Sequence, residues 1–170
     1  STDEILKAGA EVLPLRSNLE AISRYSYQVV VDDFPERAEK SREEYGGHVV
    51  IGGNNYAQGS SREHAALAPR YLGQYAVIAK SYARIAFQNL VNFGIIPFLF
   101  ADPADYERID EQDVLAFSNL HSLLREGQQV TVMNRTRNEE IPLTYELSER
   151  QIDLLLDGGL LNYLNRKKGR

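Results

Sequence analysis

Ser60 and Ser61, followed at once by Arg62, set two hydroxyls beside a permanent positive charge. Gly59 precedes them and permits a sharp turn, and Ser60 and Glu63 have the Ser-x-x-Glu spacing of a capping box at a helix start. Free backbone N–H groups and the helix dipole favour anions at such a position. An arginine also binds a carboxylate through two parallel hydrogen bonds. The pattern therefore indicates recognition of a carboxylate or phosphate beside a hydroxyl.

The same serines also have a structural interpretation, because Ser-x-x-Glu is most often only a helix cap, with a contribution of about 1 kcal/mol. We expect Ser61 to cap the helix and Ser60 to face the ligand. The histidines are His48, His64 and His121, and none has the spacing to an aspartate that would suggest a nucleophilic serine. A Gly-x-Ser-x-Gly elbow and a P-loop are both absent.

Composition limits the class of protein. The 170 residues suffice for one globular domain, expected to span 1–170, with 43% hydrophobic and 25% charged residues. The net charge of −5 argues against binding nucleic acid mainly by charge. No apolar run is long enough to cross a membrane and no signal-like segment opens the chain, so cytoplasm is the default compartment. The sequence has no cysteine, which excludes disulfides and thiolate ligands.

Hydrophobic patterning places the serine loop between a strand and a helix. Strands are expected at 48–51, 75–79 and 95–100, with helices from about residue 61 and over 82–93. This alternation is typical of βαβ units on a parallel sheet. Later strand candidates, at 114–118, 129–134 and 141–147, suit a mixed or antiparallel layer. The sequence therefore predicts an α/β fold with a part-parallel, part-antiparallel strand core.

The remaining segments are assigned by local signals. Strands are expected at 11–15 and at 25–31, the latter from its β-branched and aromatic residues. The charged stretch 32–47 is expected to be a surface loop with a short helix. Ser148 and Gln151 form a capping-box pattern that opens a helix, which Gly158 and Gly159 interrupt.

Several segments together resemble the C-terminal swivelling domain of aconitases, from about Lys7 to the end of the chain. They are LPLRSNLEAIS (13–23), GSSREHAALAPR (59–70), AVIAKSYARI (76–85), NFGIIPF (92–98) and GGLLNYL (158–164). GSSREHA is also similar to small subunits of isopropylmalate and homoaconitate hydro-lyases, whereas RYLG and KSYARI resemble aconitase. The resemblance implies a swivelling β/β/α three-layer domain.

For function, the resemblance implies an aconitate hydratase, a hydro-lyase that interconverts citrate and isocitrate through cis-aconitate. By the same resemblance, Ser60 is the general base, Ser61 and Arg62 contact the substrate, and Arg16 binds a substrate carboxylate. Mitochondrial relatives often have Gly-His after that arginine, where this chain has Ser17 and Asn18. The implied [4Fe–4S] cluster is held by other domains and none is bound by this chain, which has no cysteine.

The chain is therefore expected to be one part of an enzyme and inactive by itself. It begins at Ser1 without methionine, as a cut or processed piece would. The expected partners are the cluster-bearing domains, on the same polypeptide or a separate large subunit, and a tricarboxylate, with no membrane or nucleic acid. A mitochondrial matrix location is the alternative to cytoplasm if the source is eukaryotic.

Three alternatives remain open at this stage. The first is a related hydro-lyase: homoaconitase, isopropylmalate isomerase or methylcitrate dehydratase. The second is an RNA-binding aconitase relative, which the acidic net charge disfavours. The third is a non-catalytic binding module that keeps only the fold, which the intact Arg16 and Ser60 to Arg62 disfavour.

Overall fold

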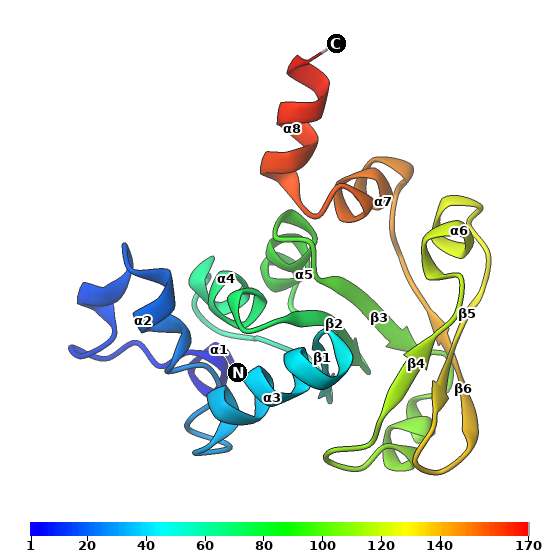
Figure 1. The fold of residues 1–170 in the computed structure, drawn as a ribbon, viewed down its shortest axis with the longest axis horizontal. Coiled ribbons are helices and arrows are strands. Elements are labelled where there is room, and N and C mark those ends of the chain that lie inside the picture. Colours follow the sequence, from blue (N-terminus) through cyan, green and yellow to red (C-terminus); the bar gives the residue numbers. More distant parts are fainter. Residues whose placement is uncertain (170) are drawn as a thin grey trace.

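A computed structural model describes residues 1–169, and these form a six-stranded sheet with helices around it (Figure 1). The strands are β1 (His48–Gly52), β2 (Gln74–Ala79), β3 (Ile96–Phe100), β4 (Leu115–Phe117), β5 (Val130–Asn134) and β6 (Glu139–Thr144). Their order across the sheet is β1-β2-β3-β6-β5-β4. The first three are parallel, and the other pairs are antiparallel. The α/β fold with a part-parallel, part-antiparallel core is thus confirmed.

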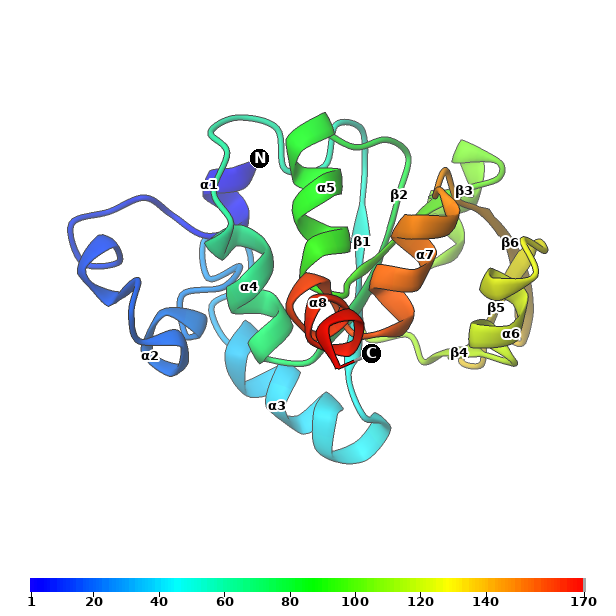
Figure 2. The same ribbon diagram turned by 90° about the horizontal axis from the view of Figure 1, so that it is seen from above.

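The helices gather mainly on one face of the parallel half, where α4, α5 and α7 lie side by side (Figure 2). The α-helices are α1 (Thr2–Ile5), α2 (Leu19–Ser23), α3 (Phe34–Tyr45), α4 (His64–Tyr71), α5 (Arg84–Asn92), α6 (Leu120–Arg125), α7 (Glu149–Leu156) and α8 (Leu160–Lys168). Two short 3-10 helices, η1 (Leu13–Leu15) and η2 (Pro103–Arg108), complete the described elements.

The sheet folds back on itself, so its antiparallel half forms a second β layer. Tyr75 on β2 and Phe117 on β4 have ring centroids 6.4 Å apart, although β3, β6 and β5 lie between their strands in the sheet. In a flat sheet four strand spacings would separate them by about 19 Å. Phe98 stacks on Phe117 between the layers at 5.5 Å. The chain therefore has the expected β/β/α layering within one continuous sheet.

Two local expectations were wrong, and a third underestimated the length of a helix. Residues 11–15 contain η1 rather than a strand. Residues 25–31 form successive turns: Tyr27 has a φ of 55°, and Val29 and Val30 are each 61% exposed, so their β-branched side chains do not enter the core. The charged stretch from residue 32 holds the twelve-residue helix α3, with Pro35 in its first turn and Gly46 as a left-handed C-cap.

Other expectations agree with the structure. The strands of the parallel half and all three later strands are present, with ends shifted by up to three residues. Ser148 and Gln151 form the reciprocal capping box of α7. Gly94 follows α5 with a φ of 76° and lies against the backbone of Gly158, where an added Cβ would come within 2.7 Å. That glycine therefore lets α5 end directly beside the turn before α8.

Candidate active site

The candidate residues lie at the carboxyl ends of the parallel strands, where the loops after β1 and β2 meet. Tyr56 in the first loop forms a parallel bridge with Tyr82 in the second. The Tyr56 amide donates to the Ser81 carbonyl at 2.9 Å, and the Ala83 amide donates to Tyr56 at 3.1 Å. Ligand sites in α/β sheets occur at this edge because consecutive loops converge there. The bridge places the serine loop beside the start of α5.

The first residues of the chain hold the serine loop from its other side. The Thr2 hydroxyl donates to the Ala57 carbonyl at 3.0 Å, and the Thr2 amide donates to the Gln58 carbonyl at 2.9 Å. Beneath the loop, the Tyr56 hydroxyl is 2.6 Å from that of Tyr27. Burial raises the pKa of the Tyr56 phenol to about 12, so this contact stays neutral and rigid. The segment of the loop before Gly59 is therefore fixed on both sides.

Ser60 and Ser61 are exposed and precede helix α4 without capping it. The N-cap is Glu63, whose φ of −60° and ψ of −34° are already helical, and no side chain accepts a cap hydrogen bond there. The expected capping box at Ser60 and the expected cap at Ser61 were therefore wrong. Within residues 1–169 neither hydroxyl has a hydrogen-bond partner, so both are available to a ligand.

Arg62 points away from solvent and holds the N-terminal segment. Its Nη1 donates to the Leu6 carbonyl at 2.7 Å, its Nη2 pairs with the Asp3 carboxylate, and its side chain is only 16% exposed. The hydrogen bond and charge of Arg62 lower the pKa of Asp3. The guanidinium expected to contact substrate is thus engaged by the chain's own carboxylate and carbonyl.

Arg16 lies in the turn between η1 and α2, with its side chain exposed. His64, in the first turn of α4, approaches the Arg16 carbonyl with Nε2 at 2.9 Å. This contact gives the histidine a positioning role and ties the Arg16 turn to the serine loop. The structure therefore places the Arg16 turn next to Ser60, Ser61 and Arg62, although these residues are far apart in sequence.

A cavity of about 300 Å³ opens beside the serines, between α4 and α5. Ser60, Ser61, Arg62 and Arg84 line it together with Asn89. Its other walls are mostly small or apolar, and about half of these residues are alanines: Thr2, Tyr56, Ala57, Gly59, Ala65, Ala66, Ala83, Ile85, Ala86 and Leu90. Arg16 is not among the lining residues. The cavity combines apolar walls with cationic and hydroxyl groups, which suits a small organic acid.

Sequence reasoning missed two charged residues of this region, Asp3 and Arg84. Asp3 precedes the matched segments and pairs with Arg62 only through the folded loop. Arg84 lies within AVIAKSYARI, which carried the resemblance without a role for the arginine. One signal was available: residues 64–101 contain no aspartate or glutamate, so a cation at the start of α5 has no acidic neighbour in sequence.

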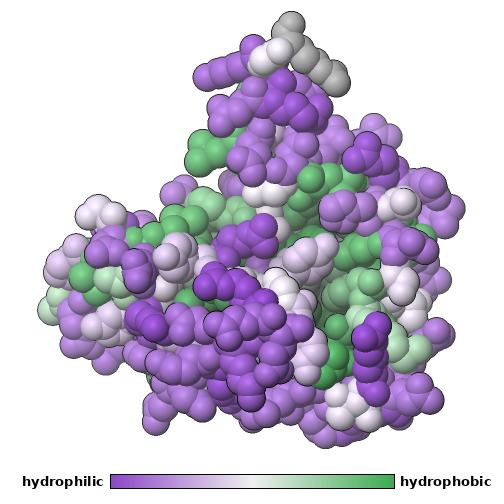
Figure 3. Space-filling model, viewed as in Figure 1, coloured by the Kyte–Doolittle hydropathy of each residue, from purple (hydrophilic) through white to green (hydrophobic). Residues whose placement is uncertain are grey.

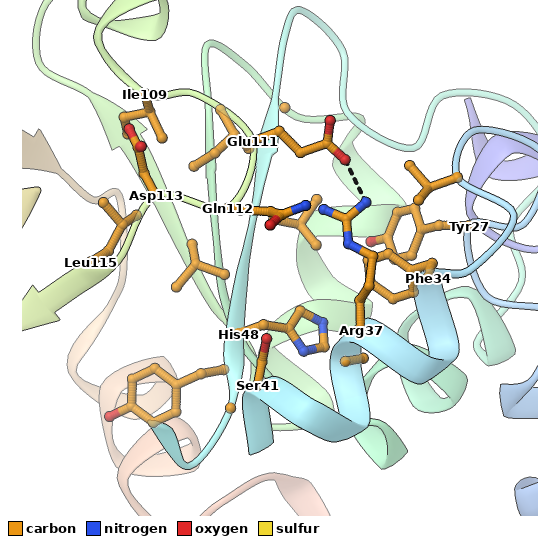
Figure 4. A pocket seen from close by; sticks show the side chains of 18 of the residues that line it. Tyr27, Phe34, Arg37, Ser41, His48, Ile109, Glu111, Gln112, Asp113 and Leu115 are labelled. Carbon is orange, nitrogen blue, oxygen red and sulfur yellow. Dashed lines mark hydrogen bonds and ion pairs between the residues drawn. The ribbon is translucent and has the colours of Figure 1, made fainter. Parts of the chain in front are cut away.

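A larger hollow, of about 1560 Å³, lies between α3, β1 and the segment from η2 to β4, and it reaches the start of the serine loop at residues 54–58. Figure 4 shows Arg37 of α3 reaching across it to Glu111, with which it forms an ion pair, and His48 below them beside Phe34. Figure 3 shows hydrophilic residues over α3 and more hydrophobic ones between α3 and the antiparallel strands. The candidate hydroxyls do not line this hollow.

His48 makes stability depend on pH. Burial lowers the pKa of its imidazole to about 4, and the nearby Gln74 side chain offsets this only in part. Neither ring nitrogen is within hydrogen-bonding geometry of a partner among the described residues. In the unfolded chain the pKa of His48 is near 6.5. Between pH 6.5 and pH 4 this side chain therefore binds a proton in the unfolded state but not in the folded state, so the free energy of unfolding falls as the pH drops through this window. From pH 7 to pH 5 the wild type should lose about 2 kcal/mol through this residue.

Urea unfolding at pH 7 and pH 5 tests this expectation. His48→Gln should be less sensitive to acid than the wild type by that amount. The exposed His121 on α6 is the matched control, and His121→Gln should keep the wild-type pH dependence. Equal pH dependence of wild type and His48→Gln would contradict the assigned burial effect.

The residues of this chain do not fit an iron–sulfur cluster, because the sequence offers no thiolate. Residues 1–169 also contain no group of three or more His, Asp or Glu side chains placed to hold a metal ion. In the same residues, no helix has the length and apolar character needed to span a bilayer.

Comparison with known proteins decides the family. A family model described as the aconitase C-terminal domain matches residues 10–103, more than half of the chain. The chain belongs to the aconitase C-terminal domain family. The matched range contains Arg16, the serine loop and Arg84, and it ends shortly after β3.

Individual proteins are also similar in sequence to this chain. The mitochondrial aconitate hydratase of Aspergillus fumigatus is 43% identical over 125 residues, which are 71% of this chain and 16% of that protein. That of Saccharomyces cerevisiae is 40% identical over 131 residues, 75% of this chain and 17% of that protein. The chain thus spans about a sixth of the length of these curated relatives.

The fold has a solved counterpart in the crystal structure of 3-isopropylmalate dehydratase (leuD) from Methanocaldococcus jannaschii. The TM-score is 0.77 at 28% sequence identity, covering 98% of this chain and 87% of the other. Both aconitate hydratases and a 3-isopropylmalate dehydratase are therefore similar to this domain.

Proposed function

We propose that residues 1–170 are one swivelling-type domain that provides the base and carboxylate-binding residues of an aconitate hydratase. The enzyme would isomerise citrate and isocitrate through cis-aconitate. The observation that carries the proposal is the cavity lined by Ser60, Ser61, Arg62 and Arg84, where neither serine hydroxyl has a hydrogen-bond partner among residues 1–169 and the Arg16 turn is held close by His64.

In this proposal Ser60 takes the proton from the carbon beside a substrate carboxylate. A serine is a weak base at its ordinary pKa, but nearby positive charge favours its ionised form. Arg84 lines the same cavity and supplies that charge, since the charge of Arg62 is already offset by Asp3. Negative charge that develops on the substrate carboxylate during proton removal is stabilised by cations already in place.

Arg16 binds a carboxylate of the substrate from its exposed position. Its planar fork can make two charge-assisted hydrogen bonds to one carboxylate. Ser61 contributes a hydroxyl at the rim of the cavity. Arg62 acts as a substrate contact only at the cost of its bonds to Asp3 and Leu6, so its first role is to hold the serine loop and the N-terminal segment together.

The proposed [4Fe–4S] cluster belongs to other domains, which meet this one as part of the same polypeptide or as a separate large subunit. When bound there, the cluster supplies a Lewis-acidic iron for the substrate hydroxyl. The word mitochondrial in the names of relatives favours the matrix over the cytoplasm in a eukaryotic host.

The solved counterpart supports a second candidate, a hydro-lyase that acts on isopropylmalate. Hydration assays with cis-aconitate, homoaconitate and isopropylmaleate separate the candidates, with the cluster-bearing part supplied and that part alone as control. We expect cis-aconitate to be hydrated with the highest kcat/KM, and this chain alone to be inactive. Preference for isopropylmaleate, or activity of the chain alone, would contradict the proposal.

A further inference from the structure

Arg84 is a cation without an internal partner on the wall of the cavity. It is exposed in the first turn of α5, and no acidic side chain within residues 1–169 lies within ion-pair distance of it. Arg62 on the same cavity differs, because Asp3 and the Leu6 carbonyl occupy two of its nitrogens. Of the two arginines that line the cavity, Arg62 keeps only its buried Nε without a partner among residues 1–169, whereas the whole guanidinium of Arg84 is available to bind an anion.

The sequence around Arg84 offers no acidic side chain that could neutralise its positive charge. Residues 64–101 contain no acidic side chain, and Gln88, one turn along α5, donates to Asn92. Ala83 and Ala86 also line the cavity, and their side chains carry no polar group that could pair with the guanidinium. An unpaired arginine kept at the edge of an apolar cavity favours an anionic ligand.

The cavity accepts a ligand with a carbon skeleton and several carboxylates. Its volume of about 300 Å³ is at the lower end of the range of about 300–1,000 Å³ that is typical of small-molecule sites. The alanine walls suit the carbon skeleton, and the Asn89 carboxamide, which has no side-chain hydrogen bond among the described residues, can meet a hydroxyl or a carboxylate oxygen.

We infer that Arg84 is a specificity-determining residue that binds the third carboxylate of a tricarboxylate substrate. The inference rests on the proposed function. A tricarboxylate needs more cationic partners than a dicarboxylate. Asp3 already offsets the charge of Arg62, so among residues 1–169 Arg84 is the arginine of the cavity wall without an ion pair, and the Arg16 turn offers a second exposed arginine. A dicarboxylate with an apolar branch in place of the third carboxylate has nothing for Arg84 to bind.

Steady-state kinetics of the cluster-containing holoenzyme test the inference. Arg84→Gln should raise KM for citrate by roughly 10–100-fold, the range for one lost charge-assisted contact. Its kcat should stay within about threefold, and KM for isopropylmalate should not rise. Glutamine and arginine have similar helix propensities, so thermal unfolding of the variant should match that of the wild type.

The matched control is Arg125→Gln, which removes an exposed arginine from α6, outside the cavity. It should leave KM for both substrates unchanged. Equal KM values for citrate in the two variants would overturn the inference. So would an Arg84→Gln variant whose kcat falls equally on both substrates with KM unchanged.

Calorimetric binding of tricarballylate, a tricarboxylate without the reacting hydroxyl, separates this inference from the proposed function. If the wild-type holoenzyme turns over neither substrate, the proposed function fails. Tighter tricarballylate binding by wild type than by Arg84→Gln would still support the carboxylate role of Arg84. Equal binding, or no binding by the wild type, would overturn that role.

Discussion

Ser60→Ala should lower kcat of the assembled enzyme by roughly 10²–10⁴-fold, the usual effect of removing a general base. KM should change far less, because the carboxylate-binding arginines remain. Thermal stability of the domain should also be unchanged, because Ser60 caps no helix and its exposed hydroxyl has no partner within residues 1–169. Kinetics after assembly with the cluster-bearing part, paired with thermal unfolding of the variant domain, measure both effects.

Ser61→Ala is the matched control for this experiment. Ser61 is equally exposed and also makes no cap bond, so its loss should leave stability unchanged and reduce turnover less than the loss of Ser60. A Ser60→Ala enzyme with a kcat within about threefold of wild type would remove Ser60 from the mechanism. The cavity would then be a carboxylate site whose base comes from elsewhere.

Arg62→Lys should weaken both folding and catalysis. The ammonium group cannot reproduce the planar fork that reaches the Leu6 carbonyl and the Asp3 carboxylate together. Leu6 is 3% exposed, and an unpaired carbonyl there costs roughly 1–3 kcal/mol of stability. Release of the N-terminal segment should also loosen the serine loop that Thr2 holds, and so lower kcat/KM. Urea unfolding and kinetics of the same variant measure the two effects.

Arg16→Lys provides the contrast. The Arg16 side chain is exposed, and its carbonyl, not its guanidinium, meets His64. This variant should lose substrate binding while its unfolding free energy stays that of the wild type. If Arg62→Lys is as stable as Arg16→Lys, the structural role assigned to Arg62 is wrong. If neither variant changes kcat/KM on citrate, both arginines lie outside the substrate site.

The parallel half of the fold was predictable because strand and helix periods alternate there without conflict. Val77 and Ile78 lie in an apolar run bounded by turns, and both are fully buried in β2. The run of valines at 29–31 has similar composition but forms turns, because Tyr27 adopts a left-handed conformation and its hydroxyl bonds Gln74 and Tyr56. Composition alone does not reveal such tertiary contacts.

The candidate site was only partly predictable for the same reason. Ser60, Ser61 and Arg62 are adjacent in sequence, so their closeness could be predicted without knowledge of the fold. The pairing of Arg62 with Asp3 and the placement of Arg84 across the cavity depend on loop closure and on the bridge between Tyr56 and Tyr82. Sequence spacing carries no information about these long-range contacts. The same contacts determine which arginine has an internal ion pair and which does not.

The position of β6 beside β3 has a consequence for synthesis on the ribosome. All the candidate residues, from Arg16 to Arg84, have emerged before residue 115, but Phe98 and Tyr75 then lack Phe117, the aromatic ring of the second β layer that they contact. Strand β3 gains its second neighbouring strand only when β6, which pairs with it through Leu143 and Thr144, has been synthesised. The nascent parallel half therefore exposes an aromatic face and an unpaired strand edge until the later half has emerged, and these features invite aggregation. Every candidate site residue of this domain is therefore synthesised well before the sheet that supports it is complete.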